Sequence, residues 1–99
     1  MKYSFHPAAE KELNDTVDYY NECRSGLGLE FTKEIYRTIQ NILLFPDAWA
    51  SLSANTRRCL TNRFPYGVIY QIIEEEILII AVMQLSREPE YWKEREKKI

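Results

Sequence analysis

Two apolar runs rich in β-branched residues, at residues 66–73 and 77–83, are the strongest pattern in the chain. Runs of this length that are rich in Val, Ile and Tyr are typical of β-strands. Only the acidic residues 74–76 separate them, which is too short a connection for anything but a turn. We therefore predict an antiparallel hairpin with an acidic turn.

The second of these runs is apolar on both sides when it is read as a strand. Alternation predicts one side made of Ile77, Ile79, Ala81 and Met83, and an opposite side made of Leu78, Ile80, Val82 and Gln84. A strand that is apolar on both sides is typical of a central position in a sheet with both faces covered. The rest of the chain is expected to provide that cover.

After a short predicted strand, the apolar residues of the N-terminal half recur at the spacing of α-helices. Residues 2–5 alternate polar and aromatic side chains and predict a short strand. His6 can then act as an N-cap, with Pro7 at the first position of a helix that continues to about Cys23. The apolar positions of that helix recur at helical spacing; they are Ala9, Leu13, Val17 and Tyr20.

A second helix is predicted between the break at residues 25–28 and Pro46. Its apolar stripe consists of Phe31, Ile35, Ile39, Ile42 and Leu43. The short break makes the two helices an antiparallel helical hairpin. Residues 46–56 are expected to form a loop holding Trp49, and residues 57–61 a strand. The predicted fold is a single α+β domain over residues 1–99, of order β-α-α-β-β-β, with an antiparallel sheet and the helical hairpin packed on one face.

Charge is distributed unevenly along the chain. The net charge is −2, yet residues 51–73 contain Arg57, Arg58 and Arg63 and no acidic residue. An acidic protein is not expected to bind nucleic acid tightly and without specificity. A local basic edge leaves room for a directed contact with a phosphate or an acidic partner.

The composition also bears on compartment and cofactors. We find neither a signal peptide nor an apolar run near the ~20 residues of a membrane span, so a cytoplasmic protein without membrane contact is expected. Cys23 and Cys59 fit no metal-ligand spacing and are predicted to be idle thiols. Neither a metal nor another cofactor is indicated, because His, Cys and carboxylates do not cluster at ligand spacing.

Several segments in order along the chain resemble the RelE/ParE superfamily. They are FHPAAEKEL, the GLG before the second helix, the FP at its end, RFPYGVIYQI, EILIIAVMQLSR and EPEYW. These proteins are the toxins of type II toxin–antitoxin modules, also called plasmid stabilization proteins. The resemblance implies the same β-α-α-β-β-β fold. It also implies a toxin that arrests growth and is neutralised by a cognate antitoxin in a hetero-oligomer.

The superfamily has two modes of action. RelE-like members cut mRNA on the ribosome, and the residues here that would hold charge or move protons in such a reaction are Arg58, Arg63, Arg87 and Tyr91. Two departures weaken the nuclease interpretation. Gly67 stands where an Arg commonly follows the Tyr of the strand, and Gln84 stands where many members carry His. Gln can hydrogen-bond a phosphate but cannot exchange a proton at neutral pH.

The sequence therefore favours a ParE-like toxin that binds DNA gyrase and is not an enzyme. A ribosome-dependent mRNA endonuclease is the alternative, and a degenerate toxin that retains only antitoxin binding is a third possibility. Arg57 and Arg58 are equally well explained as edge-strand charges that discourage aggregation. Tyr91 and Trp92 are expected to fold back onto the sheet. The antitoxin is expected to occupy a groove between sheet and helices and to pair with the basic edge.

Overall fold

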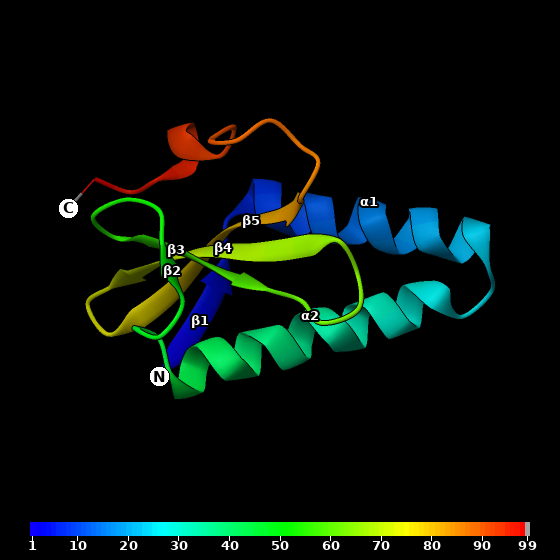
Figure 1. Cartoon of the computed structure of the whole chain (residues 1–99), viewed down its shortest axis with the longest axis horizontal. Helices are drawn as coiled ribbons and strands as arrows, with labels where there is room; N and C mark the ends of the chain where they lie inside the picture. The colour runs from blue at the N-terminus through cyan, green and yellow to red at the C-terminus, as the bar shows by residue number, and fades with distance from the viewer. Residues whose placement is uncertain (99) are drawn as a thin grey trace.

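The computed structural model describes residues 1–98, which form a sheet with two helices on one side and the C-terminal segment on the other (Figure 1). The helices are α1 (Pro7–Cys23) and α2 (Leu27–Leu44), and a short 3₁₀ helix η1 covers Lys93–Arg95. The strands are β1 (Lys2–Phe5), β2 (Ala50–Ser51), β3 (Thr56–Leu60), β4 (Tyr66–Ile73) and β5 (Glu76–Gln84). The α+β fold predicted from the sequence is confirmed.

The strand order in the sheet is β1-β5-β4-β3-β2. The pairs β2–β3, β3–β4 and β4–β5 are antiparallel, whereas β1 runs parallel to β5. The sheet is thus mixed and not wholly antiparallel, because the helical hairpin carries the chain away from β1 before it returns. The loop predicted at residues 46–56 also contains β2, which pairs with only Arg57 and Arg58.

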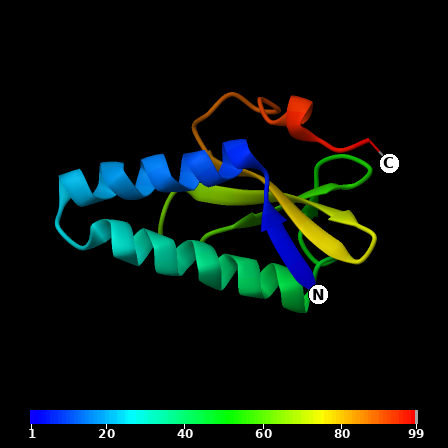
Figure 2. The same ribbon diagram turned by 180° about the vertical axis from the view of Figure 1, so that it is seen from behind.

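The helical hairpin forms as predicted, and its two helices lie antiparallel (Figure 2). His6 caps α1, since its Nδ1 accepts a hydrogen bond from the amide of Ala8 at 3.0 Å. The break is shorter than residues 25–28, because α2 already begins at Leu27 and Gly28 lies inside it. A Cβ at Gly28 would lie 2.5 Å from the carbonyl oxygen of Val17 on α1. Gly28 therefore allows the helices to approach each other closely.

The helices cover one face of the sheet with an aromatic and aliphatic core. The predicted stripe of α2 is confirmed, because Phe31, Ile35, Ile39 and Ile42 are fully buried. Phe31 lies at the centre of an aromatic cluster, with ring centroids 4.9–5.3 Å from those of its neighbours; these are Tyr20, Phe64 and Tyr66. This cluster joins the helices to the end of the sheet where β4 begins.

β5 is an inner strand between β1 and β4, covered on both faces as predicted, but a β-bulge changes which residues share a face. Ile69 pairs with Ala81 and Tyr70 pairs with Ile79, so Ile80 is an extra residue in β5. Before the bulge, Ile77 and Ile79 face the helices; after it Val82 joins them, and Ala81 and Met83 join Ile80 on the other face. The predicted placement of Ala81 and Met83 beside Ile77 was therefore wrong, because strict alternation does not survive the inserted residue.

The hairpin turn is shorter than the predicted three acidic residues. Ile73 pairs with Glu76, so only Glu74 and Glu75 form the turn. Both have positive φ angles, 50° and 66°, as the hairpin turn of type I′ requires. Glu76 belongs to β5.

The two cysteines are free thiols in opposite environments. Cys23 is exposed, while Cys59 is buried in the core at 2% exposure. Burial raises the pKa of the Cys59 thiol to about 11.

Alkylation with iodoacetamide at pH 8 should therefore modify Cys23 in the native protein and spare Cys59. Mass spectrometry should find one adduct on the native chain and two after unfolding in urea. Fast modification of Cys59 in the native protein would contradict the buried placement of β3.

Because the pKa of the Cys59 thiol is raised on folding, the contribution of this thiol to stability should decline as the pH rises through about 9 to 11.

Candidate functional site

The C-terminal segment, residues 85–98, folds back over the face of the sheet that the helices leave open (Figure 1). Trp92 is only 2% exposed and packs with Ile69, Ile80 and Met83. The end of the segment is held by Gln71, whose side-chain amide exchanges hydrogen bonds of 3.1 and 2.8 Å with the backbone of Lys97. The predicted folding back of Tyr91 and Trp92 is confirmed.

Glu12 of α1 connects this segment to the sheet. β1 pairs with β5 only as far as Ile79, so the following backbone groups on that edge have no strand beside them. Side chains bind these backbone groups instead of a neighbouring strand. The amide of Val82 donates to Glu12 Oε1 at 3.0 Å, and Arg95 Nη1 donates to the carbonyl of Ile80 at 2.9 Å. Arg95 also binds both carboxylate oxygens of Glu12, at 2.9 and 3.1 Å, with both side chains 17% exposed. Bidentate pairing in a shielded setting is a strong form of the arginine–carboxylate interaction.

Tyr91 joins the same network from the C-terminal segment. Its hydroxyl donates to Glu12 Oε2 at 2.8 Å. Burial and the neighbouring Glu12 carboxylate raise the pKa of Tyr91 well above its usual range. The guanidinium of Arg87 lies 4.0 Å from the centroid of the Tyr91 ring, a cation–π contact. The structure therefore brings two predicted site residues, Arg87 and Tyr91, together.

A cavity of about 210 Å³ lies beside this network, between α1 and the end of the sheet. Its lining residues are Glu12, Asp15, Thr16, Tyr66, Val82, Gln84 and Arg87. It therefore brings Arg87 together with Gln84, one of the two departures from the nuclease pattern noted in the sequence. Two carboxylates share the cavity with Arg87, so its charge is mixed.

The other two predicted cations lie elsewhere. Arg63, in the loop between β3 and β4, pairs with Glu30 of α2 at 2.8 Å and lies 5.2 Å from the ring centroid of Phe64. Arg58 lies on β3 and lines two different cavities, one of which it shares with Pro89 and Trp92. The four candidates Arg58, Arg63, Arg87 and Tyr91 do not converge on one cavity.

Sequence reasoning missed Glu12, Asp15 and Tyr66 as residues of this cavity. Glu12 could be interpreted only as a favourable charge near the start of a helix, since Arg95 lies 83 residues further along the chain. The ring of Tyr66 lies in the core, at 7% exposure. Nothing in the local sequence indicates that these side chains meet.

The cavity is poorly suited to phosphodiester cleavage. The carboxylate of Glu12 already accepts hydrogen bonds from Val82, Tyr91 and Arg95, and the tyrosine proton is held by that carboxylate. Asp15 pairs with Lys11 at 2.7 Å. Carboxylates beside the cavity repel a phosphate, and a neutral amide transfers no proton.

Two further findings concern metals and membranes. Within residues 1–98 no cluster of three or more His, Cys, Asp or Glu side chains could hold a metal ion. None of the helices described is long and apolar enough to cross a membrane.

Comparison with known proteins identifies the family. Residues 3–89 match the family described as the ParE toxin of the type II toxin–antitoxin system, parDE. The chain belongs to the ParE toxin family. The match contains Arg58, Arg63 and Arg87, whereas Tyr91 and Arg95 follow it. The resemblance to the ParE branch noted in the sequence is confirmed.

A solved structure supports the same fold for this ParE family member. The structure titled "Chromosomal ParDE TA system from P. aeruginosa" superposes with a TM-score of 0.75. The superposition covers 86% of this chain and 96% of that chain at 17% sequence identity, so it shows a shared fold. A search of curated protein sequences gave no match.

Proposed function

We propose that this ParE family member acts in the cytoplasm by binding DNA gyrase and is neutralised by a cognate antitoxin. The observation that carries the proposal is the cavity at the sheet end, where Glu12 and Asp15 accompany Arg87 and Gln84, whose amide cannot exchange a proton at neutral pH. A cavity of this composition favours contact with a protein surface, since Arg87 and Gln84 offer hydrogen-bonding groups to a partner. RNA cleavage would require a proton-transfer group that is free to act.

The outer edge of β3 is a suitable place for the antitoxin. β2 covers only Arg57 and Arg58, which leaves the edge beside Cys59 and Leu60 open. The adjoining cavity measures about 460 Å³, and Leu60 is 50% exposed. An extended segment of a partner can add to an open strand edge through backbone hydrogen bonds and place apolar side chains in the adjoining cavity.

Gyrase binding is tested with the purified chain in a DNA supercoiling assay, together with mapping of mRNA 5′ ends shortly after induction without antitoxin. Supercoiling should be inhibited, and no new 5′ ends should appear. Arg87→Gln should weaken inhibition by about tenfold, because one charge at the cavity is lost. The matched control Arg24→Gln removes an exposed arginine at the far end of α1 and should leave inhibition unchanged.

The other outcomes each contradict the proposal in a distinct way. New 5′ ends at ribosome-phased codon positions would identify an mRNA endonuclease. Unchanged growth without antitoxin, together with normal supercoiling, would identify a degenerate toxin. Purified antitoxin that fails to restore supercoiling would contradict neutralisation even if gyrase binding holds.

A further inference from the structure

Arg58 is a half-buried cation without a hydrogen-bond or ion-pair partner among residues 1–98. Its Nε is fully shielded from solvent and has no hydrogen-bond acceptor among residues 1–98. Within the same residues no carboxylate lies within ion-pair distance of its guanidinium. The neighbouring Arg57 differs, since its Nη1 donates to the carbonyl of Trp49 at 2.8 Å. A buried N–H without an acceptor is energetically unfavourable.

Gly67 explains why Arg58 lies flat on the sheet. Arg58 pairs with Ile69 of β4, and Gly67 lies two residues earlier on the same face. A Cβ at Gly67 would lie 3.1 and 3.2 Å from Cγ and Cδ of Arg58. The aliphatic part of Arg58 thus occupies the space that a side chain at position 67 would fill. Gly67, which departs from the nuclease pattern, therefore leaves the space that the side chain of Arg58 occupies.

Arg58 lines two cavities that also contain apolar side chains. The cavity of about 460 Å³ includes Trp49 and Leu60, beside the polar residues Thr61 and Asn62. A second cavity of about 110 Å³ includes Leu52, Met83 and Trp92. Leu52 and Leu60 are 37% and 50% exposed. A ligand carboxylate here would be flanked by apolar contacts, which strengthens the electrostatic attraction.

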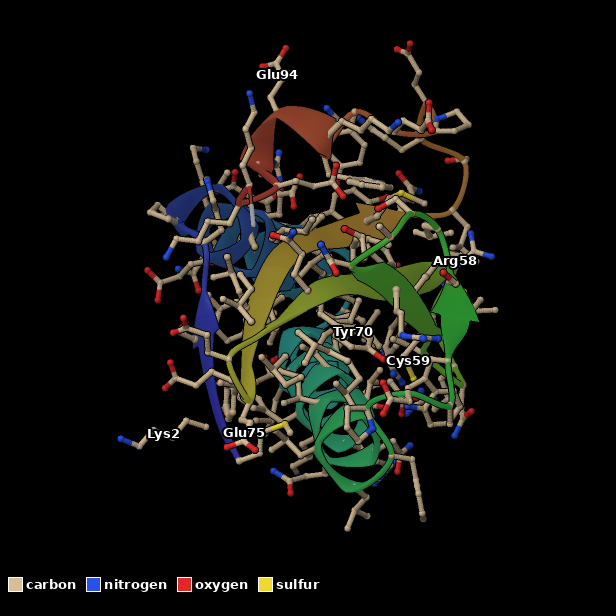
Figure 3. All side chains as sticks on the ribbon, turned by 90° about the vertical axis from the view of Figure 1, so that its left-hand side faces the viewer. Lys2, Arg58, Cys59, Tyr70, Glu75 and Glu94 are labelled. Carbon is tan, nitrogen blue, oxygen red and sulfur yellow. The ribbon has the colours of Figure 1, made fainter. Side chains whose placement is uncertain are left out.

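One acidic residue of the chain lies close by. Glu90 also lines the smaller cavity, but its carboxylate pairs with Lys93 at 3.4 Å. Glu90 forms no ion pair with Arg58. Figure 3 shows Arg58 on the β2–β3 side of the molecule, opposite Lys2 of β1, so this cation lies beside the open strand edge.

We propose that Arg58 is a carboxylate-binding site that takes an Asp or Glu flanked by apolar residues in an extended segment of the antitoxin. The proposal rests on the neutralisation proposed above and names the chemistry recognised at the β3 edge. The carboxylate accepts from the two terminal guanidinium nitrogens in a bidentate arrangement. The flanking apolar residues occupy the cavities beside Leu60 and Leu52. Charge complementarity supports this occupant, since residues 51–73 carry no acid of their own.

The first test uses two peptides, acetyl-Leu-Asp-Leu-amide and acetyl-Leu-Asn-Leu-amide. They differ only in that an amide NH₂ group of the second replaces one carboxylate oxygen of the first. In ¹⁵N-labelled protein, the Nε–H resonance of Arg58, assigned by its loss in Arg58→Lys, should shift with the Asp peptide at millimolar concentration. The Asn peptide should leave it in place, and the Arg57 resonance should not move with either peptide. Equal shifts with both peptides, or none with the Asp peptide, would overturn the carboxylate site.

The second test measures affinity for the antitoxin encoded beside the toxin gene. Arg58→Lys should weaken binding by about 10- to 100-fold, because lysine lacks the planar pair of donors. Arg57→Lys serves as the matched control and should change binding by less than about threefold. Equal affinity of wild type and Arg58→Lys would overturn the proposed occupant while leaving neutralisation intact. An antitoxin that does not bind the wild type would instead refute neutralisation, and the peptide result would still decide whether Arg58 binds carboxylates.

Discussion

Replacing Glu12 by Ala is expected to lower the free energy of unfolding by about 3 kcal/mol. The substitution leaves the shielded Arg95 without its carboxylate and removes the acceptor of the Val82 amide on an edge that no strand covers. Urea unfolding followed by tryptophan fluorescence measures the effect, because Trp92 lies buried in the segment that Glu12 holds. Glu12→Gln should lower the free energy of unfolding by less, since an amide oxygen still accepts one of these hydrogen bonds.

The control for this prediction lies on the same helix. Glu22 is exposed in the last turn of α1, and Glu22→Ala should change stability by less than about 0.5 kcal/mol. The double substitution of Glu12 and Arg95 by Ala should cost clearly less than the sum of the two single ones, because the groups act as a pair. Additive losses would show that the ion pair contributes nothing specific.

Gly28→Ala is expected to destabilise the protein by about 2–3 kcal/mol. The added methyl group would meet the carbonyl oxygen of Val17 at 2.5 Å and the side chain of Asn21 at 2.6 Å. Neither can yield easily, because Asn21 Oδ1 accepts a hydrogen bond of 2.8 Å from the amide of Gly28. The helices of the hairpin would have to move apart. Thermal unfolding followed by circular dichroism measures the loss.

Gly26→Ala separates this steric effect from backbone strain. Gly26 has a φ of +88°, which alanine adopts unfavourably, but nothing lies within 4 Å of an added Cβ. Its substitution should cost only about 1 kcal/mol. A greater loss at Gly26 than at Gly28 would contradict the close helix approach.

The sequence was sufficient to predict those features that depend on residues close to one another along the chain. The His6 cap, the stripe from Phe31 to Ile42 and the β-branched runs of β4 and β5 each follow from spacing within one element. The folding back of Trp92 was also predictable, because an indole in a polar segment needs apolar cover. These features define the fold class.

The remaining features depend on contacts that the local pattern does not contain. The extra residue Ile80 is indistinguishable from its neighbours in an apolar run, so the change of face beyond it could not be read from alternation. The parallel pairing of β1 depends on where the helical hairpin returns the chain. Gly28 resembled a helix breaker because its role is set by Val17 of another helix. The same holds for the candidate site, where Glu12 meets Arg95 only after folding.

The placement of β1 beside β5 constrains how the chain can fold as it is synthesised. β1 and α1 leave the ribosome first, yet Lys2 pairs with Glu76, and Glu12 binds Arg95 at a separation of 83 residues. Contacts of such high sequence separation form late and slow folding. The first strand must therefore wait unpaired until almost all of residues 1–98 have been made. The sheet of this chain therefore cannot be completed on the ribosome before β5 has been synthesised and released.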